Sequence, residues 1–114
     1  MSDMNMMEVD LLKSFNDKGV FCDGEFIVYK AHCAAFLQVS KSAGFAVIGI
    51  EGFYLLKDGS VKPNLDEIAD FSDIKNGDRL GEYIEACFEA ANRFVVHMNS
   101  NGKSDGYCFT LTHS

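Results

Sequence analysis

The chain has 114 residues and a mass of 12.6 kDa, and 47% of its residues are hydrophobic. That is enough apolar material for one ordinary core and too short a chain for two, so we expect a single domain over residues 1–114. Seventeen acidic against ten basic residues give a net charge of −7, and such a surface repels the phosphates of nucleic acids and anionic membranes, which argues against both as partners.

The first half of the chain predicts two helices and a hairpin. Apolar residues recur on one stripe over residues 5–16, which favours a helix with Gly19 as its C-terminal cap. Asp23-Gly24 lies between two β-prone runs and predicts a hairpin, although the same tract could also be a loop entering the next helix. That next helix is expected over residues 28–43, ended by Gly44.

The second half predicts strands followed by one long helix. Residues 45–49 and 51–56 favour strands, Asp58-Gly59 a turn, and Pro63 an edge position or the end of a strand. Residues 64–72 are expected to form a polar connection with one helical turn, with Leu65 and Ile68 pointing inward.

The clearest element is a helix over residues 78–98, with Asp78 as N-cap, followed by a closing strand over residues 107–112. Together these elements predict a small α+β domain, in which about three helices pack on a mainly antiparallel sheet of three to five strands.

The usual motifs for cofactor and metal chemistry are missing. Gly44, Gly49 and Gly52 do not form a phosphate-binding loop and more naturally mark a bulge or a close backbone approach. Asp66, Asp70 and Asp73 lack the spacing of a calcium loop, and the four cysteines form no zinc pattern. We therefore expect no cofactor and no metal ion.

The cysteines offer one alternative function. Cys33 and Cys87 fall on apolar helical faces, where a free thiol acts as a small core residue. His97 lies at the edge of the long helical stripe and is expected to be a partly buried structural residue. A Cys33–His97 pair would nevertheless suit a small cytosolic enzyme or ligand-binding domain.

The most informative feature is the acidic segment over residues 64–89, which carries most of the net charge. Three of its acids form a ridge on the long helix, opposite the apolar stripe. Such a surface would steer a basic partner toward the protein, with solubility as the simpler explanation. The predicted partner-binding residues are Asp66, Glu67, Asp70, Asp73, Asp78, Glu82, Glu85 and Glu89, and Phe53, Tyr54, Phe71 and Tyr83 are candidate anchors.

Residues 48–72 resemble small immunity proteins of bacterial polymorphic and contact-dependent toxin systems. The resemblance is carried by Ile48-Gly-Ile-Glu51-Gly-Phe53, Asp58-Gly59, Pro63 and Ile68-Ala-Asp70-Phe71-Ser72. It implies a non-catalytic protein that neutralises a cognate toxin domain, either a nuclease or another kind of toxin, and it transfers no fold or site residue. With an acidic N-terminus unlike a signal peptide and no apolar run of about 20 residues, we expect a cytoplasmic location. An adaptor with another basic partner is a third option.

Overall fold

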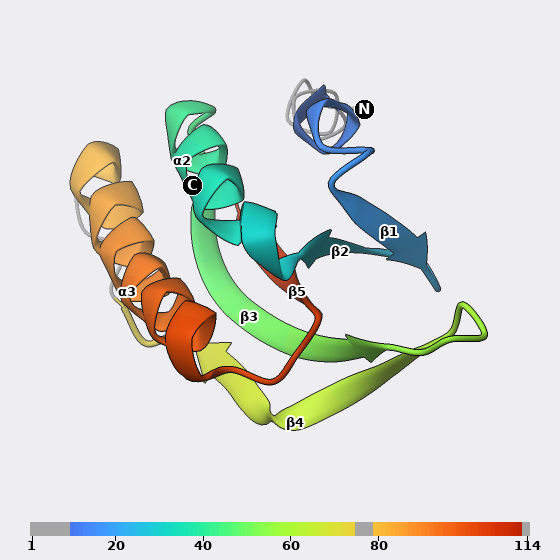
Figure 1. Cartoon of the computed structure of the whole chain (residues 1–114). Coiled ribbons are helices and arrows are strands. Elements are labelled where there is room, and N and C mark those ends of the chain that lie inside the picture. The colour runs from blue at the N-terminus through green and yellow to red at the C-terminus, as the bar shows by residue number, and fades with distance from the viewer. Residues whose placement is uncertain (1–9, 75–78, 113–114) are drawn as a thin grey trace.

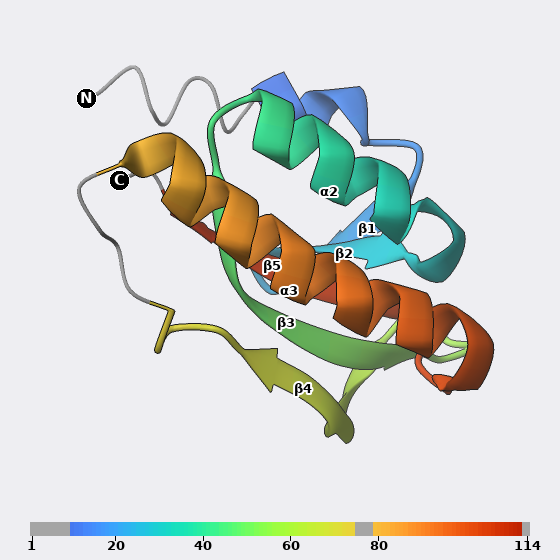
Figure 2. The ribbon, with the colours of Figure 1, turned by 90° about the vertical axis from the view of Figure 1, so that its left-hand side faces the viewer.

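The computed structural model describes residues 10–74 and 79–112. A five-stranded antiparallel sheet in the order β1-β2-β5-β3-β4 carries α2 and α3 on one face (Figures 1 and 2). This confirms the predicted α+β class. The elements in chain order are β1 (Gly19–Cys22), β2 (Glu25–Tyr29), the 3-10 helix η1 (Lys30–His32), α2 (Cys33–Ser42), β3 (Ala46–Leu55), β4 (Val61–Asp70), α3 (Leu80–Asn101) and β5 (Gly106–Thr112).

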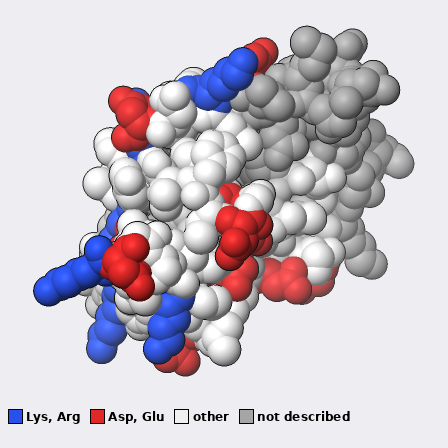
Figure 3. Space-filling model, turned by 90° about the vertical axis from the view of Figure 1, so that its right-hand side faces the viewer, with Lys and Arg blue, Asp and Glu red and all other residues white. Residues whose placement is uncertain are grey.

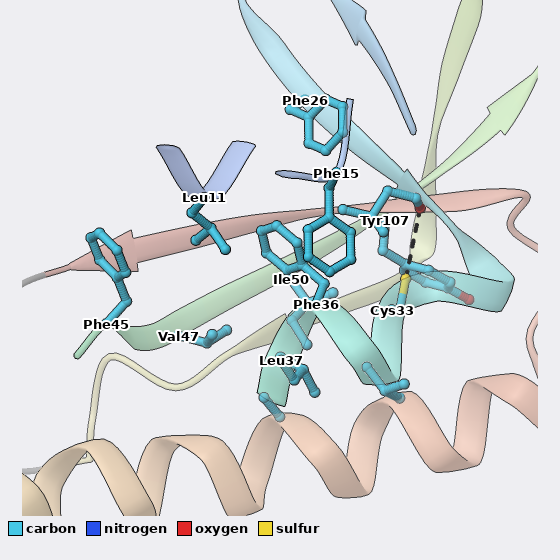
Figure 4. Close-up of a cluster of buried hydrophobic side chains, with 13 residues drawn as sticks. Leu11, Phe15, Phe26, Cys33, Phe36, Leu37, Phe45, Val47, Ile50 and Tyr107 are labelled. Carbon is cyan, nitrogen blue, oxygen red and sulfur yellow. Dashed lines mark hydrogen bonds between the residues drawn. The ribbon is translucent and has the colours of Figure 1, made fainter. Parts of the chain in front are cut away.

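The main core lies between the two helices, the sheet and the N-terminal helical segment at residues 10–14 (Figure 4). Phe36 of α2 is its centre, because its ring packs edge-on against Phe15 and stacks on Phe109 of β5. Ala91 and Val95 of α3 complete the core from the other helix. Burial of this apolar surface is the main source of stability.

The long helix is confirmed where it can be compared. Ile84, Cys87, Ala91 and Val95 are buried on the predicted stripe, and α3 runs three residues beyond the predicted end. The proposed N-cap, Asp78, lies outside the described residues. None of the helices in the described ranges combines the length and apolar character that crossing a bilayer requires.

Around the first hairpin, one prediction is wrong and another is confirmed. Gly19 does not cap a helix but begins β1, where the Ile27 carbonyl and the Phe26 ring occupy the space a side chain would need. The hairpin at Asp23-Gly24 is confirmed, with both residues at positive φ.

The helix predicted over residues 28–43 begins five residues later than expected. Val28 is fully buried in β2, where it pairs with Tyr107 of β5, so tertiary pairing overrides the local helical pattern and α2 begins only at Cys33. Gly44 ends the helix at φ +88°, as predicted.

The two strands predicted around residue 50 are one continuous strand, β3. Its pairing with β5 shifts between Val47 and Gly49, so a bulge separates two stretches of a single ladder. The turn at Asp58-Gly59 is confirmed, since Gly59 has φ +89° and Ser60 donates its backbone N–H to Asp58.

The polar connection predicted over residues 64–72 is wrong. Residues 61–70 form β4, an edge strand, in agreement with the edge position expected from Pro63. Gly52 pairs with Asn64 and Glu51 pairs with Ile68, so three extra residues bulge out of β4. Leu65 and Ile68 consequently point to solvent, with 75% and 49% of their surface exposed.

Candidate partner-binding site

The eight predicted acids do not form one surface. Asp66 and Asp70 lie exposed on β4, and Asp73 follows it, also exposed. Glu82, Glu85 and Glu89 lie on α3. We call the first three the β4 acids and the second three the α3 acids; Asp78 lies outside the described residues, and Glu67 belongs to neither group.

Glu67 is buried and serves the fold rather than the surface. Only 8% of the residue is exposed, and its carboxylate accepts three hydrogen bonds from the segment that joins α3 to β5 and a fourth from Tyr107 of β5. Oε1 accepts from the backbone N–H and hydroxyl of Ser104, at 3.0 and 2.6 Å, and from the Tyr107 hydroxyl at 2.8 Å. Oε2 accepts from the backbone N–H of Lys103 at 2.7 Å. Its prediction as a surface contact is therefore wrong.

The electrostatics of Glu67 follow from these contacts. Burial alone would raise the pKa of its carboxyl group, but the donors from Ser104, Lys103 and Tyr107 outweigh burial and lower the pKa from 4.5 to about 2. Asn64 extends the network by donating to the Ser104 hydroxyl. Gly52 is required beside it, because a Cβ there would overlap the Ser104 hydroxyl.

The α3 acids are partly neutralised by the protein's own cations. Glu85 pairs with Lys41 of α2 at 2.7 Å, and Arg79 lies 3.4 Å from Glu82. Lys41 also lies over the ring of Phe88, 4.5 Å from its centre. The ion pair thus turns Glu85 toward α2, while Glu82 and Glu89 stay exposed.

The β4 acids differ from the α3 acids in their ion pairing and in their apolar neighbours. Within residues 10–74 and 79–112, no Lys, Arg or His pairs with Asp66, Asp70 or Asp73. Hydrogen bonding from Ser72 lowers the pKa of Asp70, so this carboxylate is charged over a wide pH range. Leu65 and Ile68 alternate with these acids along the chain and supply exposed apolar surface between them.

A second acidic feature, which the sequence did not indicate, lies on the sheet face without helices. A hollow of about 470 Å³ opens there, bordered by Glu51, Ile68, Asp70 and Thr110 around Gly49. Burial, with the nearby charges of Glu25 and Glu51, raises the pKa of Cys108 to about 11. Figure 3 views the molecule from this side, with acidic side chains in the middle of the view and others at its upper left, top and lower edge, and with basic side chains at the lower left and at the top.

Most of the predicted aromatic anchors belong to the core. Phe53 is 5% exposed, and Phe71 and Tyr83 are half-buried and pack against the two hydrophobic clusters. Tyr54 is half-buried. The exposed apolar residues beside the β4 acids are instead Leu65 and Ile68, for which the sequence pattern predicts an inward orientation.

The proposed Cys33–His97 pair does not supply a reactive thiol. Cys33 is 1% exposed, its thiol hydrogen-bonds the Val28 carbonyl (dashed in Figure 4), and burial raises its pKa to about 12. His97 is exposed, not partly buried as predicted, and its ring contacts Asn101. Because the thiolate is the nucleophile, Cys33 is held in its unreactive form.

Alkylation tests this assignment. In the folded protein at pH 8, Cys33 and Cys87 should react with iodoacetamide at least 100-fold more slowly than a free thiol, because both are buried and burial raises both pKa values. Mass spectrometry of tryptic peptides measures the rates, and Cys22, which is partly exposed, is the internal reference. Rapid labelling of Cys33 before unfolding would contradict its assignment as a packing residue.

Among the described residues, no three Asp, Glu, His or Cys side chains gather closely enough to hold a metal ion. No protein-family model matches the sequence, and no curated protein shows significant similarity to it. The surface features that bear on function are the charged and apolar side chains of β4 and the hollow on the neighbouring sheet face.

Proposed function

We propose that this protein is a non-catalytic inhibitor that binds a basic protein domain, acting as the immunity protein of a bacterial toxin system. One observation carries the proposal: β4 exposes Leu65 and Ile68 beside aspartates that no cation in the described ranges neutralises. The resemblance over residues 48–72 covers the same region, including Ile68 to Ser72.

Exposed apolar residues framed by like charges are typical of a binding site for a partner of opposite charge. The apolar groups gain free energy when the partner covers them, at about 25 cal/mol per Å² removed from water. The surrounding carboxylates attract a basic partner over distances of about 10 Å and disfavour acidic ones. Solubility alone would be served by charge without Leu65 and Ile68.

The edge position of β4 supports the same conclusion. An edge strand exposes unpaired backbone groups, and Pro63, the bulge and the aspartates all discourage indiscriminate strand pairing there. Basic side chains of a partner would interact favourably with these aspartates, whereas the same edge disfavours pairing with strands of other sheets. We propose that this partner is a toxin domain whose active cleft is blocked on binding, in the cytoplasm of the producing cell. The enzyme alternative gains no support, since Cys33 is buried and His97 is exposed.

The test compares two variants of equal charge change. Asp66→Lys/Asp70→Lys alters the β4 acids, and Glu82→Lys/Glu89→Lys alters the α3 acids, so both shift the net charge by the same amount. The binding partner used is the C-terminal domain encoded by the reading frame directly upstream in the source genome. We expect the β4 variant to lose at least 100-fold in affinity by calorimetry and to lose protection on co-expression, while the α3 variant loses less than tenfold.

Circular dichroism confirms that both variants fold. Equal losses in the two variants would indicate a general charge effect and contradict the β4 site. Tight binding by the β4 variant would do the same. Metabolic genes on both sides, with no toxic neighbouring domain, would contradict the immunity function itself.

A further inference from the structure

We propose that the hollow over Gly49 receives one arginine side chain of the basic partner, held between Glu51 and Asp70. This inference rests on the proposed function, because it specifies the partner chemistry at the same end of the sheet. It adds a location: the arginine enters on the sheet face without helices, where Glu51 of β3 and Asp70, one of the β4 acids, border the hollow.

The strand register places the residues around the hollow. Gly49 of β3 pairs with Asp70 of β4 on one side and with Thr110 of β5 on the other. Glu51 follows two residues later and therefore points to the same face as Gly49. Ile68 pairs with Glu51, so the hollow has a carboxylate on two sides and an aliphatic wall beside them.

The fold itself does not need a glycine at position 49. Its φ lies outside the left-handed region, and a Cβ there would meet its nearest atoms, the Ala69 carbonyl and the Thr110 hydroxyl, at 3.6 Å. This is an ordinary van der Waals distance, unlike the overlap at Gly52. The missing side chain thus leaves free space on the sheet face beside the edge strand β4, between two acids.

The chemistry of the border favours a guanidinium group. Glu51 and Asp70 occupy diagonal positions across the β3–β4 pair, and such positions lie about 7–8 Å apart. A planar guanidinium group with five donors can therefore reach both carboxylates together. Ile68, which is 49% exposed, would cover the methylene groups of the arginine. Ser72 already orients Asp70 by donating its backbone N–H to Oδ1 at 2.9 Å.

Charge selects the partner as the source of this arginine. Within the described ranges, no cation of the chain pairs with Glu51 or Asp70. A second copy of the chain would bring another net charge of −7 to an already acidic face. A basic domain complements the face both in charge and in the apolar contact with Ile68.

The experiment titrates the ¹⁵N-labelled protein with the peptide acetyl-Gly-Leu-Arg-Leu-Gly-amide and follows amide chemical shifts. We expect saturable shifts that are largest at Gly49, Glu51, Asp70 and Thr110. The same peptide with citrulline in place of arginine should bind at least tenfold more weakly, because it lacks the charge. Gly49→Val, which fills the hollow without changing any charge, should also weaken binding of the arginine peptide at least tenfold.

Gly81→Val is the matched control, since Gly81 lies on α3 with open space around it, and it should bind like the wild type. Equal binding of the citrulline peptide, unchanged binding by Gly49→Val, or equal shifts at Glu82 and Glu89 would overturn the proposal. A dimer in sedimentation that Gly49→Val dissociates would overturn it too, by giving the hollow to a second copy. If the upstream domain binds Gly49→Val as tightly as wild type, the arginine site fails while the proposed function stands. If that domain does not bind the wild type but the arginine peptide does, the proposed function fails while the arginine site stands.

Discussion

Replacing Glu67 by alanine is expected to lower the free energy of unfolding by roughly 3–5 kcal/mol, a large share of the stability of a domain of this size. The physical reason is the donors left behind. Two backbone N–H groups and two hydroxyls, from Lys103, Ser104 and Tyr107, would lose the carboxylate they share. Urea unfolding followed by circular dichroism measures the effect.

The matched control is Asp66→Ala, one residue away. Asp66 is exposed and makes no side-chain ion pair in the described ranges, so its removal should change stability by no more than about 0.5 kcal/mol. Glu67→Gln should be intermediate, because the amide keeps one acceptor oxygen. Similar small effects at Glu67 and Asp66 would mean that the carboxylate does not hold the bulge of β4 to the segment after α3.

Acid should weaken the protein through the same carboxylate. The pKa of Glu67 is about 2 in the folded state and 4.5 as the ordinary value, so the folded state binds the proton less readily than the unfolded state. Its stabilisation is fully present well above pH 4.5 and is lost as pH falls through 4.5 toward 2. The shift corresponds to about 3 kcal/mol, most of it lost between pH 6 and pH 2.

The measurement is the difference in unfolding free energy between wild type and Glu67→Gln at a series of pH values. Exposed aspartates titrate equally in both proteins, so the difference isolates Glu67. We expect it to shrink by about 3 kcal/mol on going from pH 6 to pH 2. A difference that is independent of pH would show that folding does not lower the pKa of the Glu67 carboxyl group.

Glu67 also shows why part of the site could not be predicted. In the sequence it is one acid among eight over residues 64–89, and no local pattern separates it from Asp66. Its burial depends on the three extra residues of β4 between the partners of Glu51 and Gly52, which turn it toward Ser104. That register is a property of two strands together.

The orientation of the apolar residues of β4 could not be predicted for the same reason. Leu65 and Ile68 have the spacing of one helical turn, which indicated an inward-facing pair, but strand pairing and the bulge turn both to solvent. The division of the acids into two groups likewise required the packing of α3 against α2, seen in the Lys41–Glu85 pair. Side-chain spacing along one segment does not carry this information.

Features that depend on neighbouring residues follow directly from the amino-acid sequence: the α+β class, the stripe of α3, the turns at Gly24, Gly44 and Gly59, and the acidic net charge. Short-range sterics and hydrophobic periodicity act within a few residues and are therefore visible in the chain. The exposure of the other acids, the burial of Glu67 and the hollow at Gly49 between Glu51 and Asp70 become visible only in the folded chain. These features depend on strand register and helix packing, where residues far apart in sequence meet.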